Sequence, residues 1–277
     1  MKKCPIAFMI IVLLCAACKG GRQHDSYTPA DSMADSVTMA LPDSMERNEE
    51  PPLPEAADEL FDDFFFNFAA SKKLQQERIV FPLPVEEAGE TSYMEKKQWK
   101  TEPFFIKEDF YTLIFDSPQQ MALVKDTTVN QVTVEHIMLM AGEVNQYVFS
   151  RQSGLWRLVK LCHQQLNHNP NSQFLKFYQD FATDSAFQHR SLASQIAFVG
   201  PDPDDDFKMI EGVITPDFWD AFAPEFPKNY IYNIVYGQQN PAAMQKIFVI
   251  RGISNGLEVE VTFKLQYGRW KVTKLIT

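Results

Sequence analysis

Apolar and polar residues alternate without a break along residues 257–266, near the C-terminus. This pattern is typical of an antiparallel strand with one buried face and one solvated face. The apolar segments 246–251 (KIFVIR) and 270–275 (WKVTKL) predict a strand on either side of it. Asn255-Gly256, a strong signal for a type I′ hairpin turn, separates the first two segments. We therefore predict a three-stranded meander at the end of the chain.

The same arrangement occurs about 114 residues earlier, with predicted strands at residues 132–140, 144–151 and 155–161. The segment 147–161 (YVFSRQSGLWRLVKL) aligns with the segment 261–275 (VTFKLQYGRWKVTKL). About one identity would be expected by chance over this length. The pairs Phe149/Phe263, Gly154/Gly268, Trp156/Trp270, Lys160/Lys274 and Leu161/Leu275 are identical. We predict that each tryptophan covers the core helix of its unit, while the lysines face water.

Two stripes of aromatic residues precede these meanders. The segments 61–69 (FDDFFFNFA) and 174–182 (FLKFYQDFA) carry aromatic residues at positions i, i+3, i+4 and i+7. This spacing predicts an amphipathic helix whose aromatic face belongs to a core, with ligand binding as the alternative. The starts of the segments are 113 residues apart and the ends of the meanders 114. The chain therefore contains two units of about 110 residues, each long enough to build a core.

The N-terminus has the pattern of an export signal. Two lysines precede an apolar run at residues 6–14, and two alanines precede Cys18. The run is shorter than the roughly 20 residues that span a bilayer. The segment resembles a bacterial lipoprotein signal, which implies that Cys18 is lipidated and becomes the mature N-terminus. Cys15 stands where such signals usually carry Leu, and an ordinary cleaved signal is the alternative.

Residues 19–57 show no hydrophobic period and are rich in Asp, Ser, Met, Pro and Glu, as a linker would be. Three Asp-Ser-apolar triplets in this linker resemble the acceptor of Bacteroidetes O-glycosylation. The resemblance implies glycans on Ser32, Ser36 and Ser44, and plain low complexity is the alternative. The residues that follow Cys18 are not acidic, which favours a lipid anchor facing the periplasm over surface exposure.

A helix followed by a curved antiparallel sheet that ends on a tryptophan-bearing strand resembles the nuclear-transport-factor-2-like, or cystatin-like, fold. The resemblance covers residues 58–277 and implies a sheet wrapped around its first helix into a cone with a pocket. The whole layout is similar to an uncharacterised family of Bacteroidetes lipoproteins. We therefore expect an α+β protein with two tandem cone-shaped domains at residues 58–168 and 169–277. They would follow a signal peptide at residues 1–17 and a disordered acidic linker at residues 18–57.

Charge and cysteine content exclude some classes of partner and site. The net charge of −10, with no basic stripe, disfavours nucleic acid as a partner. Cys162 is the only cysteine beyond residue 18, so an intrachain disulfide framework is excluded from the folded part, and we predict a small buried hydrophobe there. None of the five histidines has a metal-ligand spacing. His136 lies mid-strand beside Glu135, so the two side chains point to opposite faces; a satisfied or surface histidine is favoured over a pocket role.

Two further segments could carry chemistry. Asp202, Asp204 and Asp206 resemble a calcium loop, but Phe207 and Val213 replace its required Gly and Glu, which favours a solvated loop. Thr215 and Pro216 predict the start of a short helix. We predict that the aromatic residues that follow pack this helix against the sheet: Phe218, Trp219 and Phe222. The alternative is that they line the mouth of the cone.

The sequence contains no nucleophile elbow, phosphate-binding loop or dinucleotide fingerprint, and we assign no catalytic, metal or cofactor residue. We expect a non-catalytic lipoprotein of the cell envelope that binds a small ligand or a partner protein. It would be held at the membrane by its N-terminal lipid. The alternatives are a pocket enzyme of the isomerase, dehydratase or hydrolase kind, and a spacer within an envelope complex.

Overall fold

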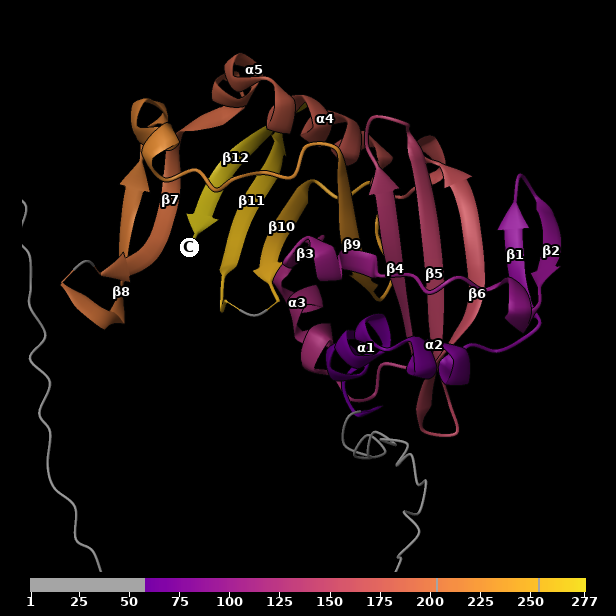
Figure 1. The fold of residues 1–277 in the computed structure, drawn as a ribbon. Helices are drawn as coiled ribbons and strands as arrows, with labels where there is room; N and C mark the ends of the chain where they lie inside the picture. The colour runs from indigo at the N-terminus through magenta and orange to yellow at the C-terminus, as the bar shows by residue number, and fades with distance from the viewer. Residues whose placement is uncertain (1–57, 203, 254) are drawn as a thin grey trace, which may run out of the picture. The chain divides into compact units, whose positions relative to one another are not determined.

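The computed structural model describes residues 58–202, 204–253 and 255–277. The described chain is an α+β unit in which twelve strands form one sheet (Figure 1). The predicted signal, the linker, Cys18 and the predicted glycan sites Ser32, Ser36 and Ser44 lie outside the described residues. Within those residues, no helix has both the length and the apolar character needed to cross a membrane.

Two helices begin each half of the described chain. The helices are α1 (Phe61–Ala70), α2 (Lys72–Arg78), α3 (Pro118–Met121), α4 (Ser172–Thr183) and α5 (Ser185–Arg190). The first half begins with α1 and α2 and the second with α4 and α5, whereas α3 occurs in the first half only. Short 3₁₀ turns are η2 (Lys96–Gln98), η3 (Phe104–Lys107), η4 (Ala122–Lys125), η5 (Leu166–His168) and η6 (Pro216–Ala221). Ser71 ends α1 and caps α2, because its side chain accepts a hydrogen bond from the Leu74 amide. Asp184 does the same between α4 and α5, with the Phe187 amide as donor.

Each half contains six strands. In the first half they are β1 (Leu83–Glu87), β2 (Glu90–Met94), β3 (Phe110–Phe115), β4 (Gln131–Met138), β5 (Glu143–Gln152) and β6 (Leu155–Gln165). In the second half they are β7 (Leu192–Asp202), β8 (Asp205–Ile214), β9 (Tyr230–Tyr236), β10 (Gln245–Gly252), β11 (Glu258–Gln266) and β12 (Arg269–Ile276). Both predicted meanders, β4-β5-β6 and β10-β11-β12, are confirmed as antiparallel. The hairpins β1-β2 and β7-β8 were not predicted.

The repeated phrase of the sequence is a hairpin turn followed by the last strand of each meander. Ser153 and Gly154 have φ angles of 50° and 82°, and Tyr267 and Gly268 have φ angles of 50° and 75°. Positive φ angles at both central residues twist a hairpin in the sense that its strands require. The two turns therefore have the same backbone conformation as well as the same glycine.

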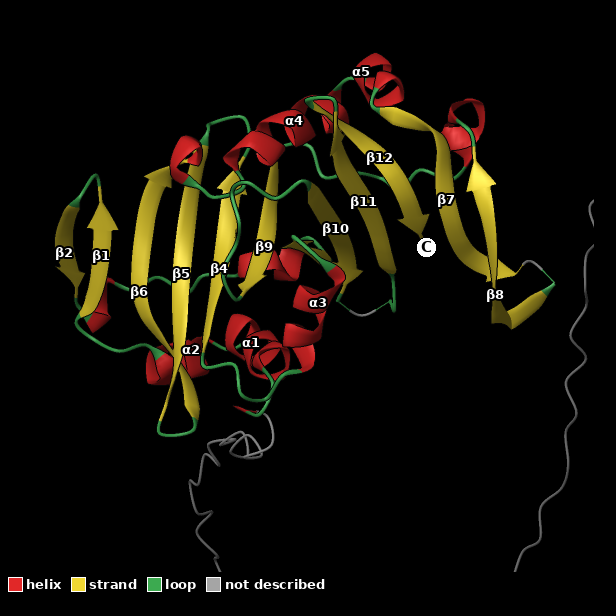
Figure 2. Cartoon of the chain, turned by 180° about the vertical axis from the view of Figure 1, so that it is seen from behind, coloured by secondary structure: helices red, strands yellow, loops and turns green. Residues whose placement is uncertain are grey.

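The order of the strands shows an exchange between the two halves. It is β2-β1-β6-β5-β4-β9-β3-β10-β11-β12-β7-β8. Figure 1 labels all of these strands, and Figure 2 shows the sheet from behind. The first-half strand β3 pairs with β10 of the second half, and the second-half strand β9 pairs with β4 of the first. The two exchanged strands meet at the centre, where Thr112 pairs with Asn233. Let each strand of β1–β6 correspond to the strand six numbers later, so that β1 corresponds to β7 and β6 to β12. The order of corresponding strands is then the same when the sheet is read from either edge.

The described residues form two hydrophobic clusters, one beside α1 and one beside α4. Phe149 lies 5.2–6.0 Å from four rings of α1, and Phe263 lies 5.1–5.7 Å from three rings of α4. Trp156 contacts Phe61 at 5.0 Å and Trp270 contacts Phe174 at 5.5 Å, which confirms that each tryptophan covers its core helix. Each cluster also contains side chains of the exchanged strand from the other half.

The segment after Thr215 forms the 3₁₀ turn η6, and the Thr215 side chain makes no capping hydrogen bond. The predicted packing of the aromatic residues is confirmed for Trp219, which is fully buried and donates to Gln188. It is also confirmed for Phe222, directly after η6, whose ring lies 5.0 Å from that of Phe198 on β7 although the residue is 42% exposed. Phe218 is exposed, because a turn of six residues presents only one side to the sheet.

Candidate functional site

A groove of about 660 Å³ lies between α1, η4 and the neighbouring strands β3 and β10. Its apolar lining includes Phe66, Phe115, Met121 and Val124. Because β3 belongs to the first half and β10 to the second, the strand exchange brings the two sides of this groove together. Apolar walls with a few convergent polar groups are the usual composition of a ligand site.

The polar groups of the groove gather around Asp62 in the first turn of α1. The hydroxyl of Tyr236 donates a hydrogen bond to Oδ1 of this carboxyl group. The hydroxyl of Tyr111 donates to Oδ2 at 3.3 Å, and the Arg251 guanidinium lies 3.6 Å from the same oxygen. The strand register explains why Arg251 and Tyr111 reach Asp62 together. Arg251 of β10 is the cross-strand neighbour of Tyr111 on β3 and of Glu258 on β11.

Burial governs the protonation of this cluster. It raises the pKa of Asp62 above that of a free aspartate, although the Tyr236 hydroxyl and Arg251 act in the opposite direction. Burial, reinforced by the neighbouring carboxyl group, also raises the pKa of Tyr111 and Tyr236, so both phenols remain protonated donors. The cluster can thus hold a proton on Asp62 and offer a cation to the polar end of an amphipathic ligand.

A second carboxyl group, Glu135 of β4, is buried in the sheet. Its side chain accepts hydrogen bonds from Gln146 at 2.9 Å, Asn169 at 2.7 Å and Asn233 at 3.0 Å. All three donors are neutral amides, and burial raises the pKa of Glu135. His136 points to the opposite face, as predicted, and stacks on Tyr232 at 4.4 Å. Burial lowers the pKa of His136.

Glu135→Gln should make the protein more stable at pH 8 than the wild type. A folded-state pKa above the unfolded value means that the protonated glutamate stabilises the fold at low pH. This contribution is lost as pH rises through the folded-state pKa. The glutamine remains neutral, and its amide can donate to Oδ1 of Asn233, which has no partner among the described residues. Urea unfolding at pH 5 and pH 8 should show a difference that grows with pH.

Glu143→Gln is the matched control for this experiment, because Glu143 lies on the neighbouring strand β5 but is exposed. It should leave the pH dependence of the urea midpoint as in the wild type. Equal pH dependence in the wild type and in Glu135→Gln would contradict a raised pKa of Glu135.

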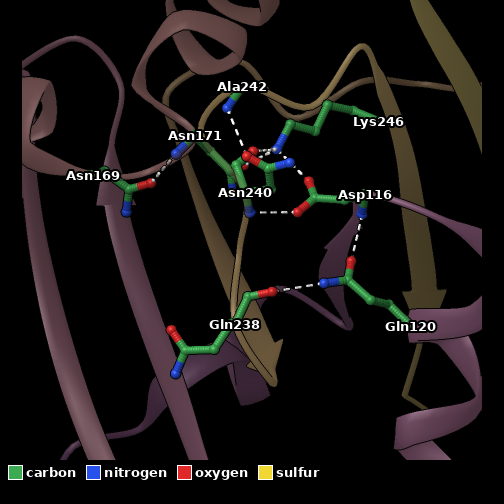
Figure 3. A network of polar contacts seen from close by, with 8 residues as sticks. All are labelled: Asp116, Gln120, Asn169, Asn171, Gln238, Asn240, Ala242 and Lys246. Atoms are coloured by element: carbon green, nitrogen blue, oxygen red, sulfur yellow. Dashed lines mark hydrogen bonds and ion pairs between the residues drawn. The ribbon is translucent and has the colours of Figure 1, made fainter.

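Lys246 of β10 is at the centre of a buried polar network that joins the two halves (Figure 3). Only 2% of this residue is exposed. Its ammonium group donates to Asp116, directly after β3, and to Asn171 at 2.5 Å, directly before α4. It also lies 3.4 Å from the Asn240 carbonyl. Lys246 and Asn171 are buried, so the centre of the network is placed to hold the exchanged strand rather than to bind a ligand.

A larger and more polar groove, of about 910 Å³, lies over β1, β5 and β6. Cys162 faces it and donates to Glu86 at 3.4 Å, while Lys160 lies 3.1 Å from the same carboxylate. The prediction of a buried small hydrophobe at Cys162 is wrong: the side chain is half-buried, because it lies on the face of β6 opposite the core. Burial raises the pKa of the Cys162 thiol, which makes it a weak nucleophile.

The described residues of the acidic loop do not form a cation site. Asp202 ends β7 and accepts a hydrogen bond from the Asp204 amide at 2.9 Å, as part of the β7-β8 turn. In the part of the chain that the structure describes, no group of three His, Cys, Asp or Glu side chains is placed to hold a metal.

The sequence did not lead us to predict Asp62 as a site residue, because its three partners come from strands far along the chain. Its place beside the aromatic stripe of α1 was the available signal.

Residues 41–277 match the family described as "Domain of unknown function (DUF4348)". The chain belongs to this family. A crystal structure of an NTF2-like protein from Bacteroides fragilis NCTC 9343 is similar to this DUF4348 protein, with a TM-score of 0.75 and 40% identity. The match covers 81% of this chain and 98% of that one. It confirms the predicted NTF2-like α+β fold with a large curved sheet, which suggests a ligand-binding or pocket-type domain. No curated protein matches the chain.

Proposed function

We propose that this DUF4348 protein is a non-catalytic envelope lipoprotein that binds a small ligand or a partner protein in the Asp62 groove. One observation carries the proposal: apolar walls and the Asp62–Tyr111–Arg251 cluster converge in a single open groove. The aromatic stripes of α1 and α4 fill the interior of both clusters. Binding therefore falls to a surface groove rather than to a hollow cone.

The scaffold of this binding protein is a tandem duplication of one NTF2-like unit, with the units at residues 58–168 and 169–277. The matching order of helices and strands in the two halves supports this proposal. The equal turn conformations at Gly154 and Gly268 and the equivalent contacts of Trp156 and Trp270 support it further. The exchange of β3 and β9 then couples the two units through backbone pairing.

The experiment that tests the groove compares two tryptophan substitutions at exposed alanines. Ala122→Trp places a large side chain in the lining of the groove, whereas Ala242→Trp lies outside it and serves as the control. Protein purified from its native envelope should carry an additional mass in native mass spectrometry, or a crosslinked partner after crosslinking in intact cells. The proposal predicts loss of this species in Ala122→Trp and retention in Ala242→Trp. Retention in both variants would contradict it.

The lipoprotein part of the proposal rests on the N-terminal sequence and has a separate test. Cys18→Ala should move the protein from the membrane fraction to the soluble fraction, because no lipid can be attached. Cys4→Ala, within the signal, is the control and should leave the protein at the membrane. Intact-mass measurement of the native protein reports lipid on Cys18 and glycans on Ser32, Ser36 and Ser44. A Cys18→Ala protein that stays in the membrane fraction would rule out the lipid anchor.

An acid–base enzyme of the isomerase, dehydratase or hydrolase kind is the second candidate, and one observation favours it. The Asp62 carboxyl group lines a ligand-sized groove, has a raised pKa and accepts hydrogen bonds from two tyrosine hydroxyls, as general acid–base chemistry requires. Asp62→Asn keeps the shape of the side chain but cannot exchange a proton. If the wild type converts the bound ligand and Asp62→Asn only binds it, the enzyme hypothesis is correct.

A further inference from the structure

The edge strand β8 exposes apolar side chains beside an unpaired backbone. In the described part of the chain, β8 pairs only with β7 and ends the sheet. Met209, Ile210 and Val213 are 54%, 41% and 61% exposed. A long edge strand with free N–H and C=O groups is a template for a further strand.

Both faces of the β7-β8 hairpin present apolar surface at this edge. On one face, Met209 lies opposite Pro201 and Val213 opposite Ala197, and all four residues are exposed. On the other face, Ile210 pairs with Gly200, and the Phe198 ring lies close to that glycine. The added strand could therefore place alternate side chains on apolar surface on both faces.

The 3₁₀ turn η6 extends the apolar surface of the second face. Phe222 packs edge-on against Phe198 at 5.0 Å and is still 42% exposed. Phe218, in the same turn, is 65% exposed. Exposed apolar side chains that gather in one place mark interaction surfaces more often than isolated ones do.

The opposite edge of the sheet differs in composition. Strand β2, with the sequence ETSYM, has one large exposed apolar side chain, that of Tyr93. Its other exposed side chains are Glu90, Thr91 and Ser92. The combination of a free edge with several exposed apolar side chains therefore distinguishes β8 from β2, and β2 offers a control surface.

Charge identifies the kind of partner. The described acidic residues of the hairpin and η6 are Asp202, Asp204, Asp205, Glu211, Asp217 and Asp220. Lys208, the only described basic residue in these two elements, pairs with Asp205 at 2.7 Å. The surplus of carboxylates favours a cationic partner. It disfavours a second copy of this chain, whose β8 would bring the same carboxylates to the interface.

We propose that β8 is a docking edge for an extended segment of a partner protein in which Lys or Arg alternate with β-branched apolar residues. The segment adds a thirteenth strand to the sheet, with its apolar side chains on the face of Ile210, Phe198 and Phe222. Its cations lie on the opposite face, where their aliphatic stems contact Met209 and Val213 and their charges lie beside Glu211. Backbone pairing provides the affinity and the alternating side chains the specificity. This surface shares no residue with the Asp62 groove.

Fluorescently labelled octapeptides with alternating Lys and Val test the proposal by anisotropy on the full-length protein. The wild type should bind the Lys/Val peptide, and the double variant Met209→Lys/Val213→Lys should bind it at least tenfold more weakly. The control Thr91→Lys/Tyr93→Lys makes the same change of charge at the β2 edge and should bind as the wild type does. Deuterium exchange should show that the peptide protects the amides of β8.

Four results would overturn the proposal: no binding of the Lys/Val peptide, equal binding by both double variants, equal binding of a Glu/Val peptide, or equal binding of a Lys/Val peptide with a central Pro. The central Pro removes a backbone donor that a paired strand needs. Dimerisation of the wild type that the β8 variant abolishes, measured by analytical ultracentrifugation, would instead identify a second copy as the occupant and would also refute the cationic partner.

Discussion

Replacing Lys246 with Met is expected to lower the free energy of unfolding by about 3–5 kcal/mol. The substitution removes the cation and leaves the Asp116 carboxylate, whose side chain is 12% exposed, without its ion pair. It also removes the donor that joins Asn171 to the end of β3. Urea unfolding followed by circular dichroism measures the loss.

Two further variants separate the buried charge from other effects of the substitution. The double variant Lys246→Met/Asp116→Leu should recover much of the lost stability, because both charges are then absent from the interior. Lys264→Met, on the solvated face of β11, should change the unfolding free energy by no more than about 0.5 kcal/mol. A loss below about 1 kcal/mol in the single variant would show that the network does not hold the exchanged strand.

Truncating either of the repeated phenylalanines, Phe149→Ala or Phe263→Ala, should cost about 3–5 kcal/mol. Each ring is fully buried at the centre of its aromatic cluster, so truncation removes several edge-on contacts and leaves a cavity. Tyr267→Ala, at a fully exposed turn, is the control and should have little effect. Thermal and urea denaturation of the three variants provides the comparison.

The milder substitutions Phe149→Leu and Phe263→Leu test whether the two clusters are independent. Their effects should add to within about 0.5 kcal/mol in the double variant, since the two rings lie in different clusters. The wild type should nevertheless unfold in one transition, because β3 and β9 are paired into the opposite halves. Strong non-additivity would show that the two clusters form one packed interior.

Residue periodicity predicted the elements whose burial follows a simple repeat. The aromatic stripes of α1 and α4 recur at helical spacing, and β11 alternates between core and water. The hairpin β1-β2 escaped prediction, because an edge hairpin buries little and LPVEE and ETSYM show no apolar alternation. The β7-β8 hairpin was missed in part because the acidic residues of its turn resemble a loop.

The candidate site could not be predicted from residue periodicity. Asp62 is one residue beyond a stripe position of α1, and its place beside the aromatic stripe is the one signal of function that the sequence offers. Asp62 becomes a candidate site residue because Tyr111, Tyr236 and Arg251 converge on it from β3, β9 and β10. These contacts join residues that lie 49 to more than 170 positions from Asp62 in the chain.

The sequence alone determined the repeated order of helix and meander, the aromatic stripes of both clusters and the opposite directions of Glu135 and His136. Only the tertiary structure decided that β3 and β9 change places and that the groove is built from both halves. The physical reason is that periodicity reports which side of an element is buried. β3 (FYTLIF) and β9 (YIYNIVY) are buried on both faces, so their apolar patterns fit a place beside several other strands equally well. Their actual neighbours are set by backbone pairing with distant segments.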